Sequence, residues 1–116
     1  MAKVQEVLDY VNAAQPNQFN DVVLVKWLNE AEGVVQTEIM KLATENLQKH
    51  DPDNLEEETV LGYPHDKLYG EYICARICEA TGEVQKANNW LSRYNDFFDE
   101  FAKWWIRNYH PGQCRM

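Results

Sequence analysis

Two cysteines have the most suggestive spacing for chemistry in this sequence. Cys74 and Cys78 are four residues apart, so on a helix both would lie on one face and both thiolates could contact one metal ion. A zinc site needs about four ligands, and the other candidates, His65, His110 and Cys114, stand at no regular spacing to the pair. Free cysteines usually behave as small buried hydrophobic residues. The sequence therefore predicts buried thiols and neither a metal nor another cofactor.

Asp51 begins a run, Asp-Pro-Asp-Asn, that resembles the start of a calcium-binding loop. Such a loop requires Gly at its sixth position and Glu at its twelfth. Here those positions hold Glu56 and Gly62. The sequence therefore argues against calcium binding by this stretch.

Carboxylates could also form a catalytic acid-base pair. The candidates are Glu30, Glu32, Asp96, Asp99 and Glu100. All of them are expected on polar helix faces with Lys and Arg between them, which is typical of solvated surfaces. The sequence has no glycine-rich phosphate loop and no signature of a nucleophilic triad. We therefore expect a protein that is not an enzyme, and a carboxylate site without a sequence signature stays open as an alternative.

The composition indicates one globular domain over residues 1–116. The chain is 45% hydrophobic and 12% aromatic, which is enough for a single core. Its formal charge of −8 and pI near 4.8 argue against a protein that grips nucleic acid by neutralising phosphates. The N-terminal stretch lacks an apolar signal core, and no apolar run is long enough to span a membrane. We therefore expect a soluble intracellular protein with reduced cysteines and no membrane partner.

The stretch 83–109 is expected to organise the fold, because its apolar residues recur in alternating steps of three and four. This seam consists of Val84, Ala87, Leu91, Tyr94, Phe98, Phe101 and Trp105. A second row, Trp90, Phe97 and Trp104, widens the apolar arc so that it can face more than one neighbour. At about 1.5 Å per residue this helix would be roughly 40 Å long. Part of it is expected to project past the core.

Three further helices are expected before it. The first has apolar residues at helical spacing from Val4 and ends near Ala14, ahead of Pro16. The second begins after the N-cap Asn20 and runs to Leu42. Its expected solvent face consists of Lys26, Asn29, Glu30, Glu32, Gln36 and Lys41. Gly33 lies inside this helix, where Gly costs roughly 1 kcal/mol of stability relative to Ala. Its presence is explained either by close approach of another backbone or by simple tolerance of the cost.

The third helix is expected to begin near Pro64 and to end at Thr81-Gly82-Glu83. So short a link predicts an antiparallel hairpin of the third and fourth helices. Residues 44–62 read as an exposed acidic loop, and residues 110–116 as a short tail. The predicted fold is therefore all-α, a small bundle of about four helices with a long last helix.

The second aromatic row of the last helix has two interpretations. It either completes a core with large residues or forms a contact between subunits, where Trp, Tyr and Arg are favoured. The candidate interface residues are Trp90, Phe97, Trp104, Arg107 and Tyr109.

Several runs, taken in order, resemble the head-tail connector proteins of tailed bacteriophages and prophages, which are also called adaptor or head-completion proteins. The resemblance covers residues 22–111 and is carried by Trp27-Leu-Asn-Glu-Ala-Glu-Gly33, Pro64-His-Asp-Lys-Leu-Tyr69, Gly82-Glu83, Asn88-Asn89, Phe101-Ala-Lys-Trp-Trp105 and His110-Pro111. It implies a structural virion subunit that forms a homo-oligomeric ring beneath the portal protein, extends the DNA channel and meets a tail-completion protein. The implied location is the host cytoplasm during assembly and then the virion neck.

An acidic chain suits such a channel, because DNA would pass as cargo without forming ion pairs. We expect the acids of the loop, which are Asp51, Asp53, Glu56, Glu57 and Glu58, to face the channel and to contribute nothing to the fold. A small prophage-encoded interaction protein that binds one protein partner through the same aromatic face is the alternative function.

Overall fold

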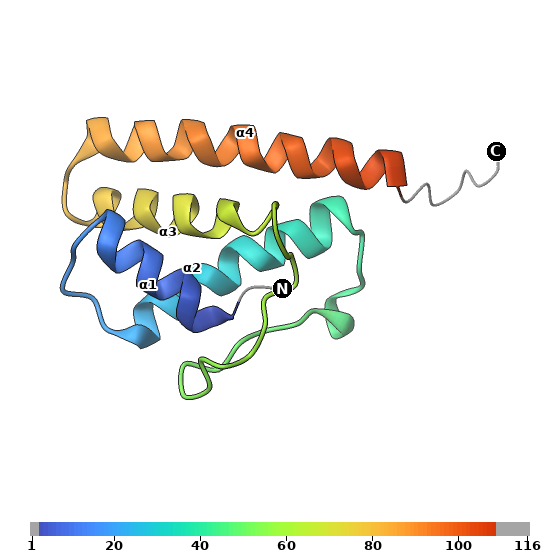
Figure 1. The fold of residues 1–116 in the computed structure, drawn as a ribbon, viewed down its shortest axis with the longest axis horizontal. Coiled ribbons are helices and arrows are strands. Elements are labelled where there is room, and N and C mark those ends of the chain that lie inside the picture. Colours follow the sequence, from blue (N-terminus) through green and yellow to red (C-terminus); the bar gives the residue numbers. More distant parts are fainter. Residues whose placement is uncertain (1–2, 109–116) are drawn as a thin grey trace.

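Four α-helices dominate the computed structural model of this chain, which describes residues 3–108 (Figure 1). They are α1 (Val4–Ala14), α2 (Asp21–Val34), α3 (Lys67–Ala80) and α4 (Val84–Asn108). A π-helical turn, Val35–Ile39, continues α2, and a 3-10 turn, Thr44–Asn46, follows it. The predicted all-α bundle is therefore confirmed.

Helix α3 lies at the centre and packs against the other three α-helices. Its buried residues include Leu68, Ile73 and Ile77, which belong to one core cluster shared with α1, α2 and α4. Cys74 and Cys78 are buried in the same helix, as predicted. Burial raises the pKa of the Cys74 thiol to about 12, which keeps it protonated. Cys114 lies outside the described residues.

The end of α1 and the start of α2 follow the sequence signals. Helix α1 ends at Ala14 as predicted. Asn20 caps α2 by accepting a hydrogen bond from the Val23 amide at 3.1 Å. The regular helix ends earlier than expected, because the π-helical turn replaces α-helix after Val34 and Lys41 adopts a positive φ of 59°. At Gly33 an added Cβ would meet nothing within 4 Å, so close approach of another described segment is not its explanation.

Helices α3 and α4 form the predicted antiparallel hairpin. In Figure 1 they lie side by side and are joined at one end by a short turn. Gly82, at φ 82°, closes α3 in the left-handed conformation. The Glu83 amide donates to the Cys78 carbonyl at 2.8 Å and the Gly82 amide to that of Glu79 at 3.3 Å, so the last carbonyls of α3 are satisfied. Pro64 was expected in the first turn of this helix and instead lies in the turn before it.

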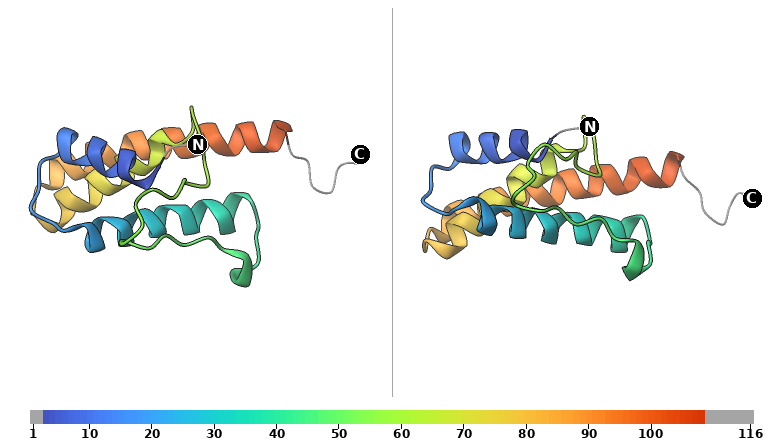
Figure 2. Two further views of the ribbon diagram at one scale, coloured as in Figure 1. Left: turned by 60° about the horizontal axis from the view of Figure 1, so that its bottom comes forward. Right: turned by 90° about the horizontal axis from the view of Figure 1, so that it is seen from below.

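The buried residues of α4 are spaced seven apart along one face of the helix, namely Ala87, Tyr94 and Phe101. The neighbouring rows, including Trp90, Phe97 and Trp104, are half-buried and pack against the core cluster. Val84, which was expected in the seam, is exposed at the first position of α4, directly after the hairpin turn. The C-terminal end of α4 extends beyond the start of α3 (Figures 1 and 2).

Close packing of α1 on α3 depends on Gly70. An added Cβ there would lie 2.5 Å from two ring carbons of Tyr10, a distance that forces the ring to move. We expect Gly70→Ala to lower the free energy of unfolding by roughly 1 to 3 kcal/mol, despite the better helix propensity of Ala. Chemical denaturation measures this. Gly33→Ala is the matched control and should be neutral or stabilising, so equal effects of the two variants would contradict this packing.

Candidate functional site

A long connection, which we call the strap (residues 47–61), runs along α2 in its first part and is held there through its backbone. The Gln36 side-chain amide pairs with both backbone groups of Gln48, at 2.8 Å to the N–H and 3.1 Å to the carbonyl. Asn29 does the same to His50, again at 2.8 and 3.1 Å. Two amide side chains on α2 and its continuation therefore replace the partner strand that an extended segment usually needs.

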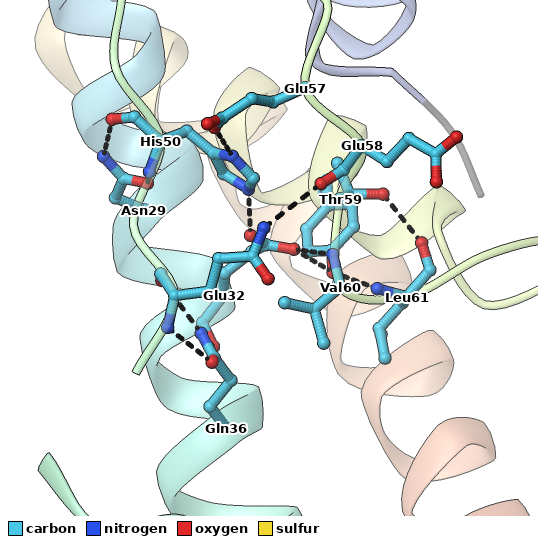
Figure 3. A network of polar contacts seen from close by, with 11 residues as sticks. Asn29, Glu32, Gln36, His50, Glu57, Glu58, Thr59, Val60 and Leu61 are labelled. Carbon is cyan, nitrogen blue, oxygen red and sulfur yellow. Dashed lines mark hydrogen bonds and ion pairs between the residues drawn. The ribbon is translucent and has the colours of Figure 1, made fainter. Parts of the chain in front are cut away.

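Glu32 stands between these two amides and is completely buried, with an exposed fraction of 0%. One of its carboxylate oxygens contacts the Nε2 of His50. The other accepts hydrogen bonds from the Tyr69 hydroxyl and the Val60 amide, both at 2.6 Å. Figure 3 shows the Glu32 side chain directed at His50 and at the backbone of Val60. These bonds join α2, α3 and both ends of the strap.

His50 lies between two carboxylates. Its Nδ1 is 2.8 Å from Glu57, and its Nε2 contacts Glu32 on the opposite side of the ring. Ionised carboxylates only accept hydrogen bonds, so both ring nitrogens must carry protons to satisfy both partners. The hydrogen bond that His50 donates to Glu32, aided by the one that it donates to Glu57, outweighs burial and raises the pKa of His50 above 6.5. We name this set of residues (Glu32, His50, Glu57 and Tyr69) the clasp.

The clasp has the residue types of an acid-base site but not the access. His50 is 3% exposed, and both of its nitrogens are already occupied by the chain's own carboxylates. Burial and the neighbouring Glu32 raise the pKa of Tyr69 strongly, so its hydroxyl stays a donor. Glu32, His50 and Tyr69 are all buried, so a substrate atom has no open route to these three while the strap is in place. The arrangement fastens the strap to the helices.

The second half of the strap also completes the N-terminus of α1. The amides of Val4 and Gln5, which have no partner within the helix, donate to the carbonyls of Glu57 and Leu55 at 2.9 Å each. Lys3 pairs with Glu56 at 2.9 Å on the surface. These bonds join the start of α1 to residues 55–57 of the strap.

These contacts correct the expectation that the acidic loop contributes nothing to the fold. Asp51, Asp53, Glu56 and Glu58 are exposed. Glu57, in contrast, reaches the buried His50 ring, and its backbone carbonyl supports α1. The expectation of no contribution to the fold is therefore wrong for Glu57, because its carboxylate compensates the positive charge of the buried His50 ring.

A second polar cluster joins α1, α3 and α4. Glu71 is buried and accepts a hydrogen bond from the Tyr10 hydroxyl at 2.9 Å, while the Arg93 Nε lies 3.2 Å from its other oxygen. Burial is the main cause that raises the pKa of Glu71, and the Tyr10 hydroxyl and Arg93 oppose it. A shallow groove of about 380 Å³ borders this cluster. Arg93 also covers the ring of Trp90 at 5.1 Å.

The four candidate interface residues that the structure describes, Trp90, Phe97, Trp104 and Arg107, lie along α4 and do not form one exposed patch. Trp90 donates to Gln15 at 3.4 Å, and Phe97 lies under the Lys67 ammonium at 4.4 Å. Trp104 packs beside His65, with ring centroids 4.9 Å apart. Arg107 is exposed, and Tyr109 lies outside the described residues.

Sequence reasoning missed the clasp because it assigned Glu32 and Gln36 to the solvent face of the second helix. Both are buried under the strap, so that assignment is wrong. Asn29, Glu32 and Gln36 follow one another in steps of three and four, which puts them on one stripe beside the apolar face. That polar stripe was the available signal for the clasp. The spacing of polar residues alone, however, does not show whether water or another segment of the chain covers them.

Within residues 3–108, no helix is both long and apolar enough to cross a membrane. Comparison with known proteins finds no matching family model, no matching curated protein and no matching solved structure.

Proposed function

We propose that this chain is a structural subunit of the head-tail connector type, which assembles into a ring and has no enzymatic activity. The observation that carries the proposal is the apolar surface around the free end of α4. A groove of about 480 Å³ lies there, lined by Met40, Pro64, Trp105 and their neighbours. Tyr63 beside it is 91% exposed, and Ile106 on α4 is 62% exposed.

A surface of this kind favours a protein partner. Large apolar side chains gathered at one end of a small domain cost solubility unless a partner covers them. The Nδ1 of His65, which lines the groove, is buried without a hydrogen-bond partner among the described residues, so an incoming chain has a polar group to satisfy. The resemblance to connector proteins supplies the kind of partner, which is a neighbouring copy in a ring under the portal protein.

The first test changes Ile106 to Glu. The new charge would be desolvated in a subunit contact but stays in water on the monomer, so assembly should weaken by tenfold or more while the melting temperature is nearly unchanged. Sedimentation velocity over a concentration series measures the assembly. Val84→Glu, at an exposed apolar position on the opposite end of α4, is the control and should assemble like the wild type. Equal assembly by both variants would exclude Ile106 from the contact.

We further propose that the exposed strap acids line the channel and keep DNA from adhering. Several copies in a ring would sum their charges, with a reach of about 8 to 10 Å in physiological salt. The variant D51N/D53N/E56Q spares Glu57 and therefore the clasp. Its assembled rings should retain more DNA than wild-type rings at low salt, in a filter-binding assay. Equal retention by intact rings would remove the channel role.

A single protein partner is the second candidate function, and the same groove supports it. A prophage-encoded interaction protein would use this surface once, in a one-to-one complex. Ring assembly and one-to-one binding differ in stoichiometry, which native mass spectrometry reads directly.

A further inference from the structure

The clasp links one proton to the position of the strap. His50 satisfies two carboxylates only when both of its ring nitrogens carry protons. Loss of one proton leaves a nitrogen lone pair facing a carboxylate oxygen, so one attractive contact becomes repulsive. The charged groups that face the ring are Glu32 from α2 and Glu57 from the strap itself, and the Tyr69 hydroxyl of α3 reaches the same Glu32 carboxylate.

The two carboxylates differ in what they can do when the proton leaves. Glu32 is fully buried and holds three donors, so it cannot turn to water without breaking contacts to α3 and to Val60. The Glu57 side chain is 38% exposed and can turn to water at little cost. The neutral tautomer with hydrogen on Nε2 therefore keeps the Glu32 contact and loses that to Glu57.

We propose that the proton on His50 is a latch, and that its loss releases residues 55–58 of the strap from the N-terminus of α1. The first half stays in place, because Gln36 and Asn29 hold the backbone of Gln48 and His50 through neutral amides that do not titrate. Release frees the Val4 and Gln5 amides together with the exposed acids Glu56 and Glu58. The device is local, and it does not rest on the proposed function.

The direction with pH follows from linkage. The folded protein raises the pKa of His50 above its unfolded value of 6.5. The stabilisation that the proton on His50 contributes is therefore complete below pH 6.5 and is lost as the pH rises through the folded value. His65, in contrast, has its pKa lowered by burial, so its contribution changes at lower pH and with the opposite sign.

Native-state hydrogen exchange by NMR tests the latch, with rates corrected for the intrinsic effect of pH. We expect protection of the Val4 and Gln5 amides to fall by up to about tenfold per pH unit above the folded pKa of His50, as the loss of one proton requires. The Gln48 and His50 amides and those of α3 should keep their protection. The ¹⁵N shifts of the His50 ring should report its deprotonation over the same pH range.

Two variants sharpen the test. Glu57→Gln removes the more exposed carboxylate and should shift the transition to lower pH, whereas Glu56→Gln, which alters only a surface ion pair, should leave it in place. His65→Gln should also keep the transition. Protection that is flat from pH 6 to 9 in the wild type, or a transition unmoved by Glu57→Gln, would overturn the latch.

Discussion

Replacing Glu32 with Ala is expected to lower the free energy of unfolding by roughly 3 to 5 kcal/mol. The substitution removes the acceptor for His50, for the Tyr69 hydroxyl and for the Val60 amide. His50 and Tyr69 stay buried and Val60 half-buried, so the cost is that of unpaired groups and of an imidazolium left with only Glu57. Thermal unfolding should show a fall of roughly 10 to 20 °C in melting temperature.

The matched control for this substitution is Glu38→Ala, in the π-helical turn that continues the same helix. Glu38 is exposed, so its loss should change the melting temperature very little. Glu32→Gln keeps the volume but not the charge, and its effect should lie between the other two. A Glu32→Ala protein as stable as Glu38→Ala would show that the clasp does not hold the fold.

Phe101→Ala is expected to cost roughly 3 to 5 kcal/mol by leaving a cavity under the C-terminal half of α4. Phe101 is the most buried aromatic residue of that helix and packs against His65, Trp104 and Trp105 at centroid distances of 5.1, 5.8 and 6.0 Å. Its loss removes the support that orients the two tryptophans at the groove. Urea denaturation measures the change in stability.

Ile106→Ala provides the comparison for Phe101→Ala, because its side chain lies mostly in water on the same helix. Its stability should stay within about 0.5 kcal/mol of the wild type. If the two alanine variants lost equal stability, Phe101 would not be the anchor of this end of the bundle.

Hydrophobic periodicity was enough to predict the helices. The seam of α4 and the Asn20 cap of α2 are local patterns, so nothing distant in the sequence is needed to recognise them. The hairpin followed from Gly82, because a left-handed residue within a three-residue link allows little else. The half-buried second row of α4 was also visible, although its role as an interface stays a prediction.

The clasp could not be predicted in the same way. Glu32 and His50 are 18 residues apart in the sequence. The strap, which carries His50 and Glu57, has no hydrophobic periodicity. Its path is set by side-chain bonds to backbone groups, which leave no hydrophobic pattern. A buried carboxylate also reads as a surface residue by composition, because Glu is rarely buried without a partner. The strap was therefore mistaken for an exposed loop that contributes nothing to the fold.

The clasp and the proposed connector function fit together in one respect. A segment with several acids repels itself and has little to bury, so it needs specific bonds to keep one position. The clasp and the amides of Asn29 and Gln36 provide these bonds. In a ring, acids held at a fixed place would give each subunit the same charge at the same radius.

Electron microscopy of the purified protein, alone at high concentration and mixed with portal rings, tests the central claim most directly. Our account predicts closed rings with a central channel, formed alone or stacked on the portal, and it predicts their loss in Ile106→Glu. A protein that stays monomeric at every concentration and leaves the portal rings bare would contradict it.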